Sequence, residues 1–260
     1  MSYLEALLLG LLQGLTEFLP ISSSGHLVLL EHLLRAPESA RMAVTAVLHL
    51  GTALALVAYF RRELAEIIGG AFSRRIETRS ASLKTAGYIA LASVPAAVVG
   101  LIAADRIDAA FSQPAVVGPM LIVTGVALFT TRFARERGQP VDSVVALAVG
   151  AVQAVAIIPG ISRSGATIAM ALFLGLKRTQ AFEFSFVMSV PVILAAAVKE
   201  LLDVDWHTVP PAAMALGVLA AFGAGLAALV LLRRAVAGRR FFWFAFYCWA
   251  AGLAALVFVR

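Results

Sequence analysis

Two short polar segments interrupt hydrophobic stretches of this chain, and they constrain the fold more than any other feature. They read Leu-Pro-Ile-Ser-Ser-Ser-Gly-His at residues 19–26 and Pro-Gly-Ile-Ser-Arg-Ser-Gly at residues 159–165. The two segments and the residues before them align at an offset of 140. Gly10, Gln13, Ile21, Ser22, Ser24 and Gly25 then correspond to Gly150, Gln153, Ile161, Ser162, Ser164 and Gly165. Backbone groups exposed by such breaks survive at membrane depth only where protein or a wet cavity surrounds them. Paired broken helices in two halves therefore indicate a central binding site.

The composition identifies a bilayer as the solvent of this fold. Of the 260 residues, 61% are hydrophobic and 14% are charged, and the mean hydropathy is +0.93. A water-soluble domain could not cover that much apolar surface. We therefore predict an all-α, polytopic integral membrane protein, with no intramolecular disulfide because Cys248 is the only cysteine. The formal charge of +6 is dispersed over loops that flank apolar segments, which favours a membrane over nucleic acid as the partner.

Six segments are long enough to cross a hydrocarbon core of about 30 Å, which needs roughly 17 to 25 residues. We predict transmembrane helices over residues 42–60, 86–104, 114–131, 181–198, 211–232 and 241–259. The two broken segments, residues 3–34 and 143–176, have arms that are short for a span, so each is predicted to form a re-entrant helical hairpin. The longest loop would then be residues 61–85. Seven glycines in the spans are expected to serve close helix packing: Gly51, Gly100, Gly118, Gly125, Gly217, Gly223 and Gly225.

Lysine and arginine predict the orientation of these helices. Most basic residues lie in four loops: Arg61, Arg62, Arg74, Arg75, Arg79 and Lys84; Arg132, Arg135 and Arg137; Lys177 and Arg178; Arg233, Arg234, Arg239 and Arg240. These loops share one side if the hairpins do not cross, and the positive-inside rule makes that side cytoplasmic. Both termini then lie on the outer face. The whole chain, 1–260, is interpreted as one membrane domain made of two repeats, 1–135 and 143–260. Each half has one hairpin and three spans, so the second repeat is inverted and the hairpin tips can meet near the midplane.

The ionisable residues at the breaks suggest phosphate chemistry. Glu17, His26 and Arg163 lie in or beside the breaks, where a charge costs at least about 2.5 to 3.5 kcal/mol. Arginine with several hydroxyls and helix starts is a phosphate-binding assembly, because guanidinium offers a bidentate fork and helix N-termini add partial positive charge. Glu17 has the wrong sign to bind phosphate. Its carboxylate would hold a divalent cation or position His26.

Residues 14–26 and 159–167, together with Glu183-Phe184-Ser185-Phe186, resemble the signature segments of the bacterial undecaprenyl-diphosphate phosphatases, the bacitracin-resistance phosphatases. The resemblance runs nearly end to end. It implies removal of the terminal phosphate of a C55 polyprenyl diphosphate, which regenerates the monophosphate carrier of peptidoglycan synthesis and gives bacitracin resistance. It also implies a multi-pass protein of the bacterial inner membrane whose active site opens to the outer face.

The resemblance carries site roles to residues of this chain. The catalytic residues would be Glu17, Ser23, His26 and Arg163, and Glu17 would also bind a divalent cation, Mg²⁺ or Ca²⁺. Substrate binding is assigned to Ser22, Ser24, Gly25, Gly160, Ser162, Ser164, Gly165 and Thr167. One departure matters: many members have a second glutamate where this chain has Gln13. An amide is a weaker cation ligand and cannot act as a base, so a site with two carboxylates is in doubt.

Several of these residues have simpler interpretations. A serine near a break can serve only as a helix cap, and we expect at least one to do so. His49, in the middle of a predicted span, is as consistent with an intramembrane hydrogen bond as with a site role. Glu183 lies near a span end and is expected to face the cytoplasmic interface.

Two functions follow from different classes of protein. The first is a phosphatase acting on a polyprenyl diphosphate lipid in the bilayer. The second is a carrier or flippase for polyprenyl phosphate, because inverted repeats with broken helices are transporter architecture. Histidine beside serine, with a glutamate upstream, favours the enzyme. The nucleophile stays open: Ser23 or a water could attack with His26 as base and Glu17 orienting the imidazole, or His26 could attack directly. No nucleic-acid partner is expected, and an oligomer is compatible with the sequence.

Overall fold

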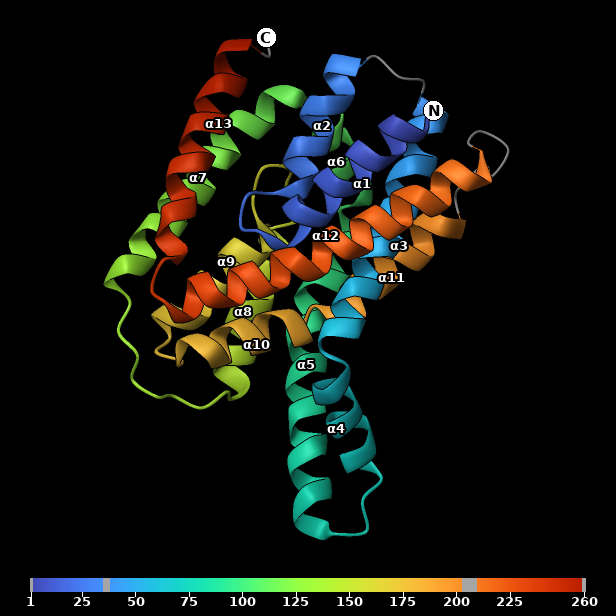
Figure 1. The fold of residues 1–260 in the computed structure, drawn as a ribbon. Coiled ribbons are helices and arrows are strands. Elements are labelled where there is room, and N and C mark those ends of the chain that lie inside the picture. Colours follow the sequence, from blue (N-terminus) through green and yellow to red (C-terminus); the bar gives the residue numbers. More distant parts are fainter. Residues whose placement is uncertain (1, 35–37, 203–209, 259–260) are drawn as a thin grey trace.

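The computed structural model describes residues 2–34, 38–202 and 210–258 (Figure 1). Within these ranges the regular elements are all helical. They are α1 (Tyr3–Phe18), α2 (Ser23–Leu34), α3 (Glu38–Tyr59), α4 (Arg61–Ala71), α5 (Ile76–Ile102), α6 (Ala104–Phe111), η1 (Pro114–Val116), α7 (Val117–Thr130), η2 (Thr131–Phe133), α8 (Ser143–Val155), α9 (Arg163–Phe173), α10 (Arg178–Val187), α11 (Val190–Leu202), α12 (Pro211–Ala237), η3 (Phe241–Trp243) and α13 (Phe244–Phe258).

Five segments of the described chain are long and apolar enough to cross a membrane. They are Ile76–Ile102, Pro114–Phe133, Arg178–Leu202, Pro211–Ala237 and Phe241–Phe258. A sixth span results if Val44–Tyr59 and Arg61–Ala71, which meet at a bend of 67°, are counted together. The protein is therefore an all-α, polytopic membrane protein, as predicted.

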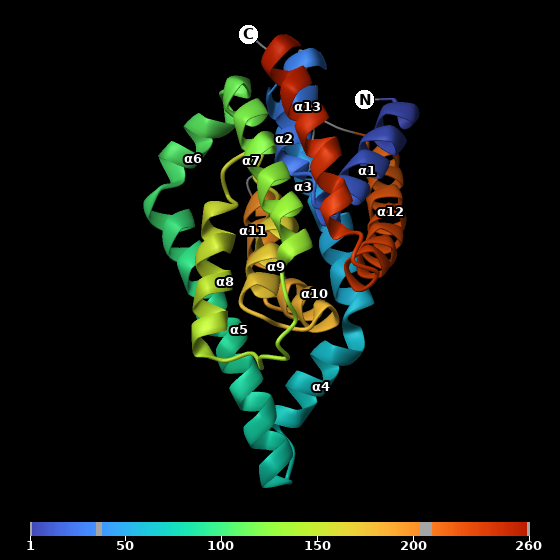
Figure 2. The same ribbon diagram turned by 90° about the vertical axis from the view of Figure 1, so that its left-hand side faces the viewer.

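The prediction of a long loop over residues 61–85 is wrong. Helix α4 begins directly after Phe60 and α5 begins at Ile76, so that only residues 72–75 connect them. Leu64 and Ile67 of α4 pack against the main hydrophobic core, and apolar residues at this spacing give a helix one buried face. The α4–α5 turn projects from the rest of the molecule (Figures 1 and 2).

Both polar breaks separate two short helices, as the repeat predicts. The hairpin of α1 and α2 opens toward the end of the molecule where the chain termini lie, whereas that of α8 and α9 opens toward the α4–α5 turn (Figures 1 and 2). The two breaks meet inside the protein, where the Gly160 N–H donates to Ser22 Oγ at 3.1 Å. The two hairpins therefore enter from opposite ends and touch at their tips. Their re-entrant position in a bilayer stays a prediction.

Equivalent glycines pack the first helix of each hairpin onto a long helix of the other half. A Cβ on Gly10 of α1 would collide with the carbonyl oxygen of Gly217 on α12, and a Cβ on Gly150 of α8 would collide with that of Ala92 on α5. Gly10 and Gly150 are related by the sequence offset. The same kind of contact therefore occurs in both halves.

The expectation of close packing holds for five of the seven span glycines. Added Cβ atoms would lie within 3 Å of neighbouring atoms at Gly51, Gly118, Gly125, Gly217 and Gly225. It is wrong for Gly100 and Gly223, where no heavy atom of the described chain lies within 4 Å of an added Cβ. These two glycines face away from other helices, and sequence alone could not separate them from the rest.

The ends of the molecule agree with the predicted orientation. The start of α1 and the end of α13 lie at one end, and the α4–α5 turn lies at the other (Figure 1). The segment that joins the two halves is held by α10 and the loop before it: Glu136 Oε1 is 3.3 Å from Arg178 Nε, and the Arg137 N–H donates to the Gly175 carbonyl at 2.9 Å. The predicted orientation also places Arg35, Asp203, Asp205 and Arg260 on the outer face, and these residues lie outside the described ranges. Which end faces the cytoplasm stays a prediction.

Candidate active site

The first break is organised by the hydroxyl of Ser22. This residue has φ +67°, a left-handed conformation that is uncommon for a residue with a side chain. Its Oγ accepts from the Gly25 N–H at 3.3 Å and from the Gly160 N–H at 3.1 Å, and it lies 3.2 Å from Ser24 Oγ. Ser22 therefore satisfies backbone donors from both hairpins and fixes one tip against the other.

The second break is fixed by Gly160 and Thr124. Gly160 has φ +94°, and a Cβ there would lie 2.7 Å from the Val117 carbonyl oxygen, so this position needs glycine. Thr124 Oγ1, on α7, donates to the Gly160 carbonyl at 2.8 Å and accepts from the Ser162 N–H at 3.1 Å. One buried threonine thus satisfies two backbone groups that the break leaves outside any helix.

Several hydroxyls assigned to substrate binding are engaged within the second hairpin. Ser162 is the N-cap of α9, because its Oγ accepts from the Gly165 N–H at 3.1 Å, and this confirms that at least one serine is a cap. Ser162 Oγ lies 3.3 Å from Ser164 Oγ, and Thr167 Oγ1 donates to the Arg163 carbonyl at 2.8 Å. All three side chains are buried. Their contacts with substrate stay predictions.

A charged cluster joins the two hairpins beside the tips. Glu17 Oε1 accepts from Arg163 Nη2 at 2.6 Å, and Glu17 Oε2 accepts from Ser23 Oγ at 2.6 Å. Gln13 Nε2 donates to Glu17 Oε2 at 3.2 Å. The Glu17 and Arg163 side chains are 13% and 17% exposed, so the pair is shielded from solvent but open on one side. The structure therefore brings together three of the four predicted catalytic residues, one of them from the other half of the chain.

His26 lies in a separate arrangement. Its Nδ1 is 2.8 Å from the Ser22 carbonyl oxygen, and its Nε2 is 2.7 Å from the hydroxyl of Tyr247 on α13. One of the two roles predicted for Glu17 was to orient this ring, but the Glu17 carboxylate instead contacts Ser23 directly. The difference arises because Glu17 is on the last turn of α1, where its side chain reaches the first residue of α2 and Arg163.

Two site neighbours escaped the sequence prediction. Tyr247 and Thr124 lie in apolar spans with no motif around them. His49 Nδ1 pairs with Glu200 Oε2 at 2.7 Å, which favours the hydrogen-bond interpretation of His49. Glu183 is partly buried on α10.

The described residues could offer a divalent cation only a few oxygen ligands. The Gln13 Oε1 atom is buried and has no hydrogen-bond partner in the described chain, and it belongs to the residue that contacts Glu17. Within the described residues no group of three or more His, Cys, Asp and Glu side chains could hold a metal. Magnesium is commonly bound by one or two carboxylates together with substrate phosphates and waters. Glu17, the Gln13 carbonyl and the substrate would make such a set.

Aromatic rings close the site on one side. Phe18, which follows Glu17, packs edge-on against Phe186 at 5.8 Å, and Phe60 and Phe182 complete the cluster. All four rings are fully buried, and they come from α1, α10 and the α3–α4 junction. The route from the charged cluster toward the α4–α5 end is therefore filled by packed side chains.

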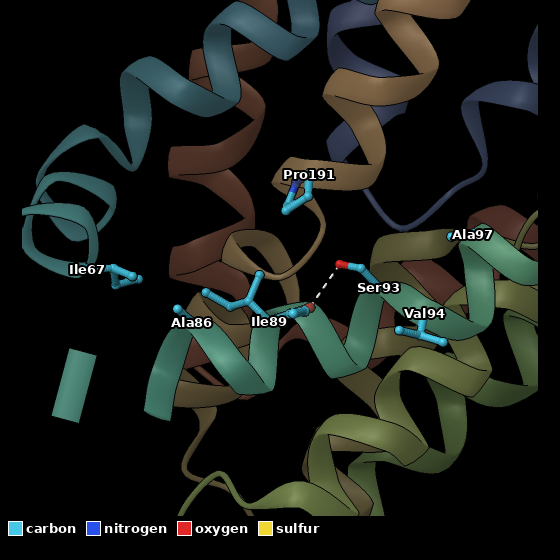
Figure 3. A pocket seen from close by; sticks show the side chains of 8 residues that line it. Ile67, Ala86, Ile89, Ser93, Val94, Ala97 and Pro191 are labelled. Atoms are coloured by element: carbon cyan, nitrogen blue, oxygen red, sulfur yellow. Dashed lines mark hydrogen bonds between the residues drawn. The ribbon is translucent and has the colours of Figure 1, made fainter. Parts of the chain in front are cut away.

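The cleft shown in Figure 3 is a different place. It has a volume of about 470 Å³ and is lined by α4, α5 and the start of α11: Ile67, Ala86, Ile89, Ala90, Ser93, Val94, Ala97 and Pro191. Its one polar side chain, Ser93, already donates to the carbonyl of Ile89 at 2.8 Å. This apolar lining suits hydrocarbon and does not suit phosphate.

Comparison with known proteins gives the family. The family described as "Bacitracin resistance protein BacA" matches residues 6–254. The chain belongs to this family. Both breaks and Tyr247 lie within the matched range.

Curated relatives of similar length carry one name. The protein named undecaprenyl-diphosphatase from Desulfatibacillum aliphaticivorans is 39% identical and covers 99% of each chain. Proteins of the same name from Korarchaeum cryptofilum and Desulfosudis oleivorans are 40% and 41% identical, over 98% and 97% of this chain and 99% and 97% of their own.

Proposed function

We propose that this protein is an undecaprenyl-diphosphatase, a membrane hydrolase that converts undecaprenyl diphosphate to the monophosphate and inorganic phosphate. The observation that carries the proposal is the contact of one carboxylate with both a serine hydroxyl and an arginine, at 2.6 Å each. An activated hydroxyl beside a guanidinium is what phosphoryl transfer requires. The names of the full-length relatives support the same substrate.

In the proposed mechanism the Ser23 hydroxyl transfers its proton to Glu17 as its oxygen attacks the terminal phosphorus. The Ser23 O–P bond forms, the bridging P–O bond breaks, and undecaprenyl phosphate leaves. A water then attacks the phosphoserine: its oxygen bonds to phosphorus, the Ser23 Oγ–P bond breaks, and the proton held by Glu17 returns to Ser23 Oγ. The water keeps one proton in the new P–OH group and loses the other to solvent, so inorganic phosphate leaves and both residues regain their starting state. Ser23 is favoured over His26 as the nucleophile because a carboxylate contacts its hydroxyl, whereas Tyr247 occupies His26 Nε2.

Arg163 would stabilise the charge on the transferring phosphoryl group. Its guanidinium can exchange its contact with Glu17 for two phosphate oxygens, as planar guanidinium does in bidentate pairs. Helices α2 and α9 begin at Ser23 and Arg163, so the positive ends of their dipoles add to the same field. The guanidinium charge and the helix dipoles act in a site that is shielded from solvent, where electrostatic stabilisation is strongest.

We further propose that a divalent cation, Mg²⁺ or Ca²⁺, takes part. Glu17 and the Gln13 carbonyl would hold it together with substrate phosphate oxygens. A bound cation would neutralise charge on the diphosphate. Gln13 supplies no negative charge, so the protein contributes a single carboxylate.

The cellular setting is proposed from the same resemblance. The protein would be a multi-pass component of the bacterial inner membrane, with its two inverted repeats placing the site near the midplane. Access from the outer face is supported by the buried aromatic cluster on the α4–α5 side. Undecaprenyl phosphate would return to peptidoglycan synthesis as the carrier lipid. The same activity would give bacitracin resistance.

The test is phosphate release from undecaprenyl diphosphate by the purified protein, with Mg²⁺ or Ca²⁺ and with chelator. We expect release with cation, loss of release on chelation, and loss in Ser23→Ala but not in Ser80→Ala, an exposed serine of α5. A protein that binds the lipid without releasing phosphate under any of these conditions would favour the carrier.

A further inference from the structure

Tyr247 lies outside both hairpins and contacts His26. It is on α13, 221 residues from His26 in sequence, and its hydroxyl is 2.7 Å from His26 Nε2. The two rings are nearly parallel, with centroids 5.7 Å apart and an interplanar angle of 14°. The phenol therefore meets the edge of the His26 ring in a defined orientation.

The other ring nitrogen determines the tautomer. His26 Nδ1 is 2.8 Å from the Ser22 carbonyl oxygen, and a carbonyl only accepts hydrogen bonds, so Nδ1 carries the proton. In the neutral ring Nε2 then has the lone pair, and the Tyr247 hydroxyl donates to it. The Ser22 carbonyl therefore assigns the proton to Nδ1, and the Tyr247 hydroxyl assigns the lone pair to Nε2.

The backbone around Tyr247 is closely packed. The next residue, Cys248, is fully buried, and its thiol contacts the Pro20 carbonyl at 3.4 Å. One turn further along, a Cβ on Gly252 would lie 2.8 Å from the Gly118 carbonyl oxygen of α7. Helix α13 is thus fixed against both the first break and α7, so the phenol has a defined position. Tyr247 itself is 46% exposed, so it is not a buried core residue.

We propose that Tyr247 is a positioning residue of the active site, which holds His26 in the Nδ1–H tautomer with its basic Nε2 directed to the phenol. This hydrogen bond, together with the one at Nδ1, opposes rotation of the imidazole about its Cβ–Cγ bond. The expected effect on turnover rests on the proposed phosphatase function. The tautomer of the His26 ring can be measured whether or not the protein is a phosphatase.

The direct test is nitrogen NMR of protein labelled with ¹⁵N-histidine in lipid bilayers, at mildly alkaline pH, with His26 assigned through a His26→Asn variant. We expect a protonated Nδ1 and an unprotonated Nε2. In Tyr247→Phe, which keeps the ring but removes the hydroxyl, the Nε2 resonance should shift while Nδ1 stays in place. An unshifted Nε2, or a protonated Nε2 in the wild type, would overturn the proposal.

The activity test separates positioning from a purely structural role. His26 is one of the predicted catalytic residues, so we expect loss of this hydrogen bond, about 0.5 to 1.5 kcal/mol, to reduce kcat roughly 2- to 10-fold with KM little changed. The same substitution in a His26→Ala background should have no further effect, because the ring to be positioned is gone. Tyr88→Phe on α5 is the matched control. Equal losses in both backgrounds would contradict the proposal, whereas an inactive wild type with the NMR result intact would contradict only the phosphatase function.

Discussion

A single carboxylate links the two halves of the chain at the scale of individual residues. Glu17 is largely buried and would be costly as an isolated charge, and Arg163 offsets that cost from the other half. Both residues could be predicted from the sequence, because a charge beside a break in an apolar helix usually marks a functional site. The contact between Glu17 and Ser23 could not be predicted, since it depends on how the last turn of α1 meets the first turn of α2.

The geometry of Arg163 gives a prediction at this scale. Arg163→Lys keeps the charge but loses the planar fork, and removing one preorganised donor typically lowers turnover about 100- to 1000-fold. Phosphate release under saturating substrate measures this effect, and Arg62→Lys on α4 provides a charge-matched control at an exposed site. Near-wild-type turnover in Arg163→Lys would show that a point charge is enough.

At the scale of elements, the tips of the two hairpins support each other. Ser22 and Thr124 satisfy the backbone groups exposed by the breaks, and Gly160 allows the tips to approach. The repeated motif was sufficient to predict both hairpins, because glycine and serine interrupt helices wherever they cluster. Thr124 was not predictable, since its hydroxyl gains a role only when α7 packs beside the second break.

Substituting the tip glycine tests this support. Gly160→Ala places a side chain at a left-handed backbone position and against the Val117 carbonyl, and we expect destabilisation of roughly 1 to 3 kcal/mol, together with loss of activity. Gly223→Ala on α12 has open space and a helical backbone, so it should be neutral or stabilising. Unfolding in detergent followed by circular dichroism compares the two. Equal stability of both variants would mean that the tips do not need to touch.

The missed helix α4 shows where the sequence was misleading at this scale. Residues 61–85 contain many charges and no long apolar run, which is typical of a loop. Within this range Leu64 and Ile67 of α4 pack against the core. Tertiary packing of this kind contributes most of the stability of short helices, and hydropathy alone does not reveal it.

At the scale of the whole molecule, the termini and the α4–α5 turn lie at opposite ends (Figure 2). The positive-inside rule predicts that the turn lies in the cytoplasm, because Arg74, Arg75 and Arg79 lie at its tip. The distribution of basic residues thus gives an orientation that this fold can adopt, and the orientation itself stays a prediction.

Cysteine labelling tests this orientation. In a Cys248→Ala background, a cysteine at Ser2 should react with a membrane-impermeant maleimide in intact spheroplasts. A cysteine at Arg79 should react only after the membrane is opened. Labelling of both positions from the same side would contradict the fold in the bilayer, and reversal of the two would contradict only the assigned orientation.

The contact between Glu17 and Arg163 also has a consequence for how such a chain can arise. Ser23 and Arg163 occupy the same position of the repeat, and the counterparts of Glu17 and His26 are Ile157 and Ala166. Two identical halves would place either two serines or two arginines at that position, and could never supply together the proposed nucleophile and the arginine proposed to act beside it. The chain can be compared with a heterodimer whose two subunits are joined by a linker. The first repeat contributes the serine and the second contributes the arginine. Separately expressed halves would have to reassociate as an unlike pair before any catalysis could occur.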